Sequence, residues 1–247
     1  MLKADLEKSW QARYERWATI YDEEHRIAGW SSEGLSRRLS LVLRLISKAG
    51  LKAGSLVLDV GAGPGTYTRA IHNMGHNCFG LDYSRKVIEV AKRKGERESY
   101  VQGEAYYLPF QDGAFEAVVC IGVLQSLETP AAALKEINRV LVPGGHLFLD
   151  GLNSLFWLHK LRRWKESLKG KKKKMSYYNP HYIQGEAERA GFSEARLHWL
   201  AVPEFFQRCV NHPWQAESYL AGWLVGHAFL LQAQKNYRGE CADYLGK

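Results

Sequence analysis

Short apolar runs alternate along this chain with longer segments in which apolar residues recur every three or four positions. The runs have the length of buried strands, and the longer segments have the period of amphipathic helices. This alternation predicts an α/β protein with a largely parallel sheet. We expect strands at Ser55–Val60, at Asn77–Asp82, within Val101–Ala105, within Phe115–Leu124, at His146–Asp150, from Phe192 to about Ala201, and at Ala228–Gln234.

Two helical patterns precede the first strand, over residues 3–22 and about 33–49. The first carries an aromatic stripe typical of core packing, made of Trp10, Tyr14, Trp17 and Tyr21. We therefore expect an N-terminal helical cap (1–50), a main α/β domain (51–235) and a C-terminal tail (236–247). Within the main domain, we expect an insertion at 151–178 and a variable substrate segment at 203–225.

The first strand runs directly into a glycine-rich turn, Gly61-Ala62-Gly63-Pro64-Gly65. Alternate glycines let the backbone fold tightly and approach a ligand that a Cβ would block. Dinucleotide-binding turns have the spacing G-x-G-x-x-G, whereas this turn has G-x-G-x-G. Asp59, just before the turn, would repel a pyrophosphate but could stabilise a cationic ligand or orient the turn. The pattern favours a nucleoside that carries a positive charge.

Acidic residues follow the next two strands. Asp82 ends the second strand about 20 residues beyond the glycine turn, where a carboxylate accepts hydrogen bonds from ribose hydroxyls. Ser84 is placed to cap the next helix. Glu104 follows the third strand, and 134–145 is a helical pattern that ends in Pro-Gly-Gly. With the glycine turn and the apolar segment Phe115–Leu124, these make five segments that follow one another in a defined order.

In that order and spacing, the segments resemble the class I S-adenosylmethionine-dependent methyltransferases, particularly the quinone-biosynthesis type. The resemblance covers roughly residues 50–200. It implies a doubly wound, seven-stranded, mostly parallel Rossmann-like sheet with an antiparallel last strand, N-terminal helices and a helical insertion after the fifth strand. It also implies S-adenosyl-L-methionine as cofactor and S-adenosyl-L-homocysteine as product.

The resemblance also implies a cofactor site. Asp82 would hold the ribose, Glu104 and the next backbone amide would hold the adenine, and Tyr21 would fold over the cofactor. Glu104 departs from the family's more common Asp. The full expected set is Asp59, Gly61, Ala62, Gly63, Gly65, Asp82, Tyr83, Glu104, Ala105, Ile121 and Tyr21.

Charge is concentrated in the insertion. Residues 151–175 hold nine Lys or Arg against one acid, which equals the formal net charge of +8 of the whole chain. Trp157, Leu161, Trp164 and Leu168 share one helical face within it. This basic amphipathic segment, with Arg162–Lys174 as its cationic part, could meet an anionic membrane surface or RNA phosphates. It could also be a lid whose apolar face covers the active site.

Catalysis by methyl transfer needs alignment of the acceptor more than it needs acid–base chemistry. A general base is required only if the acceptor must lose a proton. His25, His159 and His181 are the candidates because each lies in an element that could border the pocket. The sequence does not select one of them, so the catalytic residues stay open.

The absence of known motifs narrows the range of possible methyl acceptors. The Asn/Asp-Pro-Pro-aromatic motif of nucleobase-amine methyltransferases is replaced after the fourth strand by Ile121–Ser126. We therefore expect a small-molecule or lipid-like acceptor. An RNA- or tRNA-modifying methyltransferase that uses the basic insertion is the first alternative. A cofactor-binding regulatory protein without transferase activity is the second, and an aminopropyltransferase-like enzyme would need acidic residues for a polyamine.

The composition of the 247-residue chain fits a cytoplasmic enzyme. No apolar run reaches the ~18 residues of a membrane helix, and the first residues lack the apolar core of a signal peptide. The four cysteines are widely spaced and no metal-site spacing occurs, so no metal is expected. The oligomeric state stays open.

Overall fold

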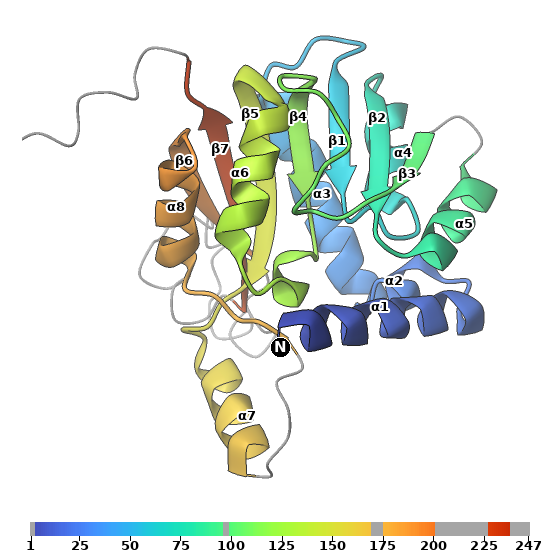
Figure 1. Ribbon diagram of the computed structural model, residues 1–247, viewed down its shortest axis with the longest axis vertical. Helices are drawn as coiled ribbons and strands as arrows, with labels where there is room; N and C mark the ends of the chain where they lie inside the picture. The colour runs from blue at the N-terminus through green and yellow to red at the C-terminus, as the bar shows by residue number, and fades with distance from the viewer. Residues whose placement is uncertain (1–2, 96–98, 169–174, 201–226, 238–247) are drawn as a thin grey trace, which may run out of the picture.

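The computed structural model describes residues 3–95, 99–168, 175–200 and 227–237. Seven strands form one sheet in the order β3-β2-β1-β4-β5-β7-β6 (Figure 1). The strands are β1 (Leu56–Val60), β2 (Asn77–Asp82), β3 (Ser99–Gln102), β4 (Phe115–Cys120), β5 (Leu141–Leu152), β6 (Phe192–Leu200) and β7 (Ala228–Lys235). β1 to β5 pair in parallel, and β7 lies antiparallel between β5 and β6. The predicted Rossmann-like sheet with an antiparallel last strand is confirmed.

Helices cover both faces of the sheet. They are α1 (Lys3–Ile20), α2 (Glu24–Ile27), α3 (Ser32–Lys48), α4 (Thr66–Asn73), α5 (Arg85–Lys94), α6 (Pro130–Val140), α7 (Trp157–Leu168) and α8 (Pro180–Arg189), with a short 3-10 turn, η1 (Leu124–Ser126). The N-terminal region differs from the two helices expected. The first ends at Ile20, and α2 lies between it and α3. Gly29, at φ +74°, follows α2, and the Ser31 side chain caps α3.

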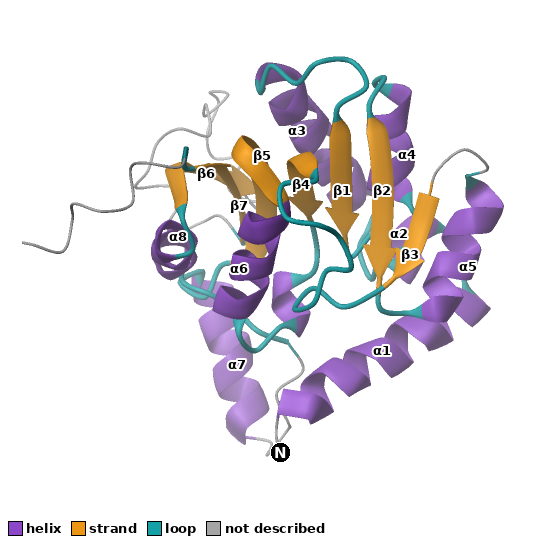
Figure 2. Ribbon diagram, turned by 45° about the horizontal axis from the view of Figure 1, so that its top comes forward, coloured by secondary structure: helices purple, strands orange, loops and turns teal. Residues whose placement is uncertain are grey.

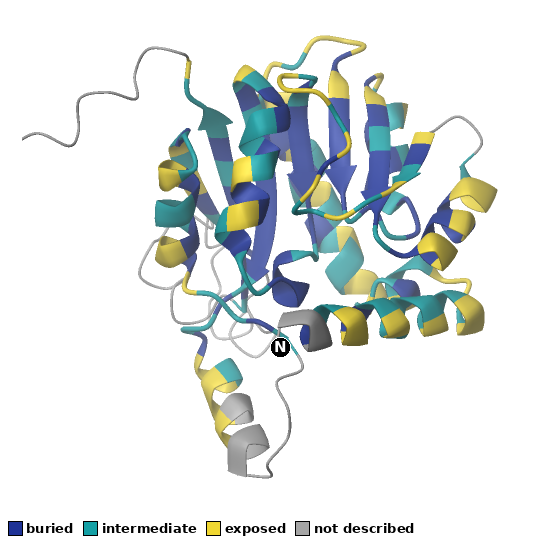
Figure 3. Cartoon of the chain, in the orientation of Figure 1, coloured by how far each residue is buried: buried dark blue, intermediate teal, exposed yellow. Residues whose placement is uncertain are grey.

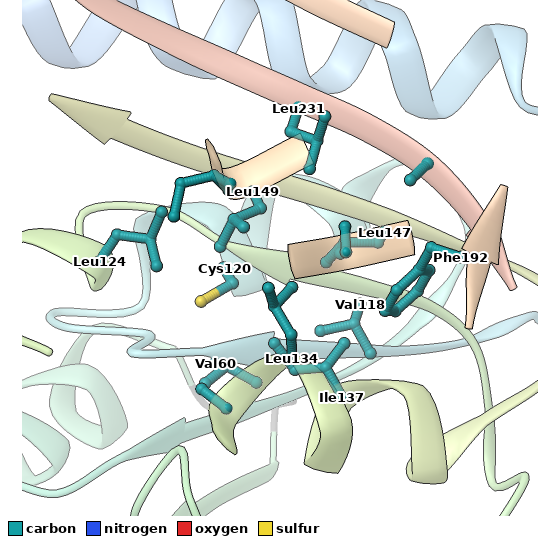
Figure 4. Packing of buried hydrophobic residues seen from close by; sticks show 14 of the residues in the cluster. Val60, Val118, Cys120, Leu124, Leu134, Ile137, Leu147, Leu149, Phe192 and Leu231 are labelled. Carbon is teal, nitrogen blue, oxygen red and sulfur yellow. The ribbon is translucent and has the colours of Figure 1, made fainter. Parts of the chain in front are cut away.

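The core has two layers because alternate strand residues point to opposite faces of the sheet. Leu58 and Val118 belong to the layer under α6 and α8, while Val57 and Val119 belong to the layer under α3 and α4. Figure 4 shows the first layer, where Leu134 and Ile137 of α6 lie beside Val118, and Figure 3 shows the strands buried along their length. Burial on both faces explains why these strands read as apolar runs.

β5 is longer than the predicted His146–Asp150. It begins at Leu141, and between the pairs Phe115↔Leu141 and Ala117↔His146 the register shifts. Four residues of β5, 142–145, therefore lie opposite the single residue Glu116. The Pro-Gly-Gly turn expected from the sequence is thus an irregularity inside the strand.

α1 crosses the edge of the sheet at which β1 and β2 end (Figure 2). Trp10 and Leu6 of α1 are buried, and Tyr14 packs edge-on against Tyr83 just after β2. Ligands of parallel sheets bind at the carboxyl ends of the strands. The N-terminal helix therefore forms a roof over the edge where a ligand is expected.

α7 extends away from the sheet (Figure 1). Trp157 is 48% exposed and Trp164 is 59% exposed, and Leu158 and Leu161 are also exposed. Their face does not cover the sheet edge, so the lid interpretation of the insertion is not supported by the described residues. Within those residues, no helix is long and apolar enough to cross a membrane.

Candidate functional site

A cavity of about 320 Å³ lies at the carboxyl ends of β1, β2 and β4, beneath α1. Eight residues of the expected cofactor set line it: Gly61, Ala62, Gly63, Asp82, Tyr83, Glu104, Ala105 and Ile121. They come from four separate segments of the chain. The sequence motifs and the cavity therefore coincide over most of the expected site.

The glycine turn forms one wall of this cavity, and its glycines bring the backbone itself to the cavity surface. Gly61 has φ +74°, and a Cβ on it would lie 2.2 Å from Cγ2 of Val123. Gly65, also at positive φ, begins α4, and a Cβ there would lie 2.3 Å from the Tyr100 hydroxyl. Gly65 thus does not line the cavity itself but allows the turn to pack against Tyr100.

Asp82 connects the end of β2 to the glycine turn. Its Oδ2 accepts a hydrogen bond from the Gly63 N–H at 2.9 Å, and its Oδ1 accepts one from the Ser84 N–H at 2.9 Å. Burial raises the pKa of Asp82 to about 6, partly offset by these backbone donors. Each carboxylate oxygen keeps a lone pair that can accept a further hydrogen bond.

Asp59 joins β1 to α4, the two elements on either side of the glycine turn. It is buried and lies outside the cavity lining, and its Oδ2 accepts a hydrogen bond from the Thr68 hydroxyl of α4 at 2.7 Å. Burial raises its pKa to about 7, against the lowering effect of the Thr68 hydrogen bond. Of the two roles expected for Asp59, the geometry favours orientation of the turn.

Aromatic side chains that the sequence did not single out as ligands complete the cavity. Tyr14, Trp30, Tyr67 and Tyr106 line it together with Tyr83. The buried hydroxyls of Tyr67 and Tyr83 have no hydrogen-bond partner in the described part of the chain. A buried hydroxyl without a partner is costly, so a bound ligand is a natural partner for each.

Tyr21 lies elsewhere. The Arg26 guanidinium stacks 3.9 Å above its ring, and Tyr21 packs against a small cluster around Ile27. α1 ends at Ile20, so Tyr21 leaves the helical stripe. Tyr14, seven residues earlier on the same stripe, takes the place over the cavity. The aromatic stripe of the first helix was therefore the sequence signal that could have indicated Tyr14.

None of the three candidate histidines lines this first cavity. His25 lies in α2 outside both cavities of the described structure, and His181 is exposed at the start of α8. His159 of α7 lies 2.9 Å through Nδ1 from the Asn153 carbonyl oxygen and lines a second cavity. Of the three, only His159 therefore lines a cavity, and that cavity is the second one.

The second cavity, of about 420 Å³, adjoins the first, because Ala28 and Trp30 line both. Arg38 lines it from α3 and forms a buried ion pair of 3.1 Å with Asp150 of β5. Oδ1 of Asp150 accepts a hydrogen bond from the Gly122 N–H, so this pair connects α3 to the loop after β4. Among the described residues, no cluster of three or more metal-ligand side chains occurs.

Comparisons with known proteins bear on this geometry. Residues 58–149 match the methyltransferase domain family. A demethylmenaquinone methyltransferase of Renibacterium salmoninarum is 32% identical over 150 residues, which cover 60% of this chain and 61% of that protein. A probable tRNA methyltransferase 9B of Homo sapiens is 37% identical over 101 residues, covering 40% of this chain and 21% of that protein.

Among solved structures, a methyltransferase solved in complex with a Haloferax volcanii methyltransferase activator superposes with a TM-score of 0.66 at 19% identity. The alignment covers 91% of this chain and 98% of that one, which shows a shared fold. By sequence, the chain spans about three fifths of the length of the demethylmenaquinone methyltransferases it matches. The family match runs from β1 into β5 and so includes the glycine turn, Asp82 and Glu104. Over residues 58–149 the chain therefore matches a methyltransferase domain, and this match together with the relatives supports a class I S-adenosylmethionine-dependent methyltransferase.

Proposed function

We propose that this protein is an enzyme that transfers the methyl group of S-adenosyl-L-methionine to a small organic acceptor and releases S-adenosyl-L-homocysteine. The observation that carries the proposal is the cavity beside the glycine turn, with Asp82 bonded to the Gly63 N–H at its edge. A second cavity shares a wall with it and offers the acceptor a place. The demethylmenaquinone methyltransferase relatives support a small-molecule acceptor.

The lining fits the cofactor. Asp82 would accept hydrogen bonds from the ribose hydroxyls, because each of its oxygens retains a lone pair. Glu104 and the Ala105 backbone would meet the adenine. The buried hydroxyls of Tyr67 and Tyr83 would gain partners from the ligand. Gly61 has no Cβ, and a Cβ there would clash with the Val123 side chain that lines the same cavity.

When bound, the cofactor supplies a methyl carbon already activated by its sulfonium. The chain's residues then have to hold the acceptor in line and exclude water. Tyr14 of α1 and Trp30, which lies between α2 and α3, would help to position the acceptor and exclude water, since both line the cofactor cavity. Burial raises the pKa of Tyr14, so its hydroxyl stays protonated at neutral pH and acts as a hydrogen-bond donor. No base is assigned: His25 and His181 line neither cavity, and His159 lines the second cavity with its Nδ1 2.9 Å from the Asn153 carbonyl oxygen.

Radiolabel transfer tests the proposal. The purified protein is incubated with methyl-labelled S-adenosylmethionine and a host extract, which is then divided into RNA, protein, lipid and small-molecule fractions. Label in the small-molecule or lipid fraction supports the proposal. Label in RNA supports the alternative suggested by the tRNA methyltransferase relative. Absence of label from protein that binds the cofactor supports the regulatory alternative.

We further propose that α7 rests on an anionic lipid surface. Trp157, Leu161 and Trp164 recur at spacings of four and three residues and are all exposed. His159, on the opposite side of the helix, contacts Phe156 and Tyr177 of the protein body. The apolar face therefore points away from the body.

The helix also carries basic residues, since Lys160, Arg162, Arg163 and Lys165 lie within Trp157–Leu168. An apolar face of tryptophan and leucine in a basic helix is typical of helices that lie in a membrane interface. Anionic headgroups complement the charge, and a surface position would suit a lipid-like acceptor.

A further inference from the structure

The second cavity has walls that suit a flat, apolar molecule. Three tryptophans, Trp10, Trp17 and Trp30, line it, and Tyr177 and His159 lie among its other lining residues. Aromatic rings gain most from ring-shaped partners, against which they stack or pack edge-on. The lining of this cavity therefore favours a planar ring system.

Among the described residues that line this cavity, one arginine has no carboxylate partner. Three arginines line the cavity, but Arg37 is paired with Glu33 and Arg38 with the buried Asp150. Arg13 has no carboxylate partner in the described part of the chain. Its guanidinium lies 4.4 Å from the ring centre of Trp10 and 5.5 Å from that of Trp17. The two rings orient the guanidinium while its N–H groups keep their capacity to donate.

A second donor lies beside Arg13. Trp10 is only 4% exposed, it lines the cavity, and its Nε1 is buried without a hydrogen-bond partner in the described structure. A buried donor without a partner destabilises the protein unless a ligand satisfies it. Trp10 and Arg13 are one helical turn apart, so both can address one oxyanion.

The second cavity lies beside the cofactor cavity. Ala28 and Trp30 line both cavities. A ligand held here would therefore lie next to the cofactor. This is the position that a methyl acceptor requires.

We infer that the second cavity is the acceptor site and that the acceptor is a planar organic anion. Its ring system packs among Trp10, Trp17 and Trp30, and its carboxylate or other oxyanion binds Arg13 and the Nε1–H of Trp10. The assignment as acceptor rests on the proposed methyltransferase function, whereas the anion site itself rests on the cavity alone.

Titration calorimetry on protein saturated with S-adenosylhomocysteine tests this. The probes are 2-naphthoate and its neutral isostere 2-naphthamide, which differ in charge but hardly in shape. We expect the unmodified protein to bind the carboxylate more tightly than the amide. Arg13→Gln should weaken naphthoate binding roughly 10-fold or more, as expected for the loss of a charged hydrogen bond, and leave the amide unchanged. Trp10→Phe, which keeps a ring but loses the N–H, should weaken naphthoate binding less.

Arg16→Gln is the matched control, because Arg16 is an exposed arginine of the same helix outside the cavity. It should bind both probes as the unmodified protein does. Equal affinity for the two probes, no binding of either, or naphthoate binding unaffected by Arg13→Gln would overturn the inference. If the unmodified protein fails to bind S-adenosylhomocysteine but shows Arg13-dependent naphthoate binding, the acceptor assignment is wrong together with the proposed function.

Discussion

Oδ2 of Asp82 accepts a hydrogen bond of 2.9 Å from the backbone N–H of Gly63, which joins the end of β2 to the turn that follows β1. The same carboxylate accepts from the Ser84 N–H at the start of α5. One buried side chain therefore fixes two strand ends and keeps lone pairs directed to the cavity. The turn and the proposed ribose acceptor are held in place before any ligand binds, which reduces the cost of ordering them on binding.

Cofactor binding should weaken as pH falls through about 6. The pKa of Asp82 is raised to about 6 by burial, and protonation would remove an acceptor that the ribose hydroxyls need. We expect the dissociation constant of S-adenosylhomocysteine to increase below this pH, measured by calorimetry in a pH series. In Asp82→Asn the dependence should flatten. A profile equally steep in the variant would assign the titration to another group.

Gly61→Ala should disrupt the turn more than the same change at a comparable glycine. Both Gly61 and Gly50 have a positive φ, near +74° and +72°, but an added Cβ meets Val123 at 2.2 Å only at Gly61. Gly50→Ala has nothing within 4 Å and isolates the backbone strain, about 1 kcal/mol. Gly61→Ala should cost clearly more in free energy of unfolding by urea denaturation and should weaken cofactor binding. Equal effects would mean that Val123 moves aside freely.

Asp59 should make the protein less stable as pH rises. Its pKa is about 7 in the folded protein and 3.8 in its ordinary state, so between these values the folded state binds more protons than the unfolded state. Its contribution to the free energy of unfolding is full below about pH 4 and decreases as pH rises through 7. The difference between the unmodified protein and Asp59→Asn, measured by denaturation across this range, isolates that contribution from other groups. A difference independent of pH would contradict it.

The exposed face of α7 predicts binding to charged vesicles. The protein should sediment with phosphatidylcholine vesicles that contain phosphatidylglycerol, should not sediment with phosphatidylcholine alone, and should be released by salt. Replacing Trp157 and Trp164 by Ser should reduce the partition at least about 10-fold, because two large apolar groups leave the interface. Tyr182→Ser, at an exposed aromatic residue of α8, is the control. Binding to RNA with none to vesicles would contradict this proposal.

The sheet and one wall of the site could be predicted because they depend on local sequence. The strand that ends at Val60, the glycine turn and Asp82 are each read from a few adjacent residues. The roof could not be predicted in the same way. Tyr14 lines the cavity and Tyr21 does not, because α1 ends at Ile20, and no local pattern indicates where that helix ends.

The second cavity could not be predicted from local sequence patterns either. Its residues come from α1, α3, η1 and α7, which are brought together only by packing. The direction of α7 also depends on packing, since the periodicity of Trp157 and Leu161 defines an apolar face but not the side on which it lies. The contact of His159 with Tyr177 settles that side.

The assignment of the first cavity to the cofactor is tested by calorimetric titration of the unmodified protein and of Asp82→Ala with S-adenosylhomocysteine. We expect one binding site, and an affinity weaker by about 30-fold in the variant, which corresponds to roughly 2 kcal/mol for a lost charge-assisted contact. The melting temperature of the variant, followed by circular dichroism, verifies that it folds. No binding to the unmodified protein, or equal affinity in a folded Asp82→Ala variant, would contradict the assignment of this cavity to the cofactor.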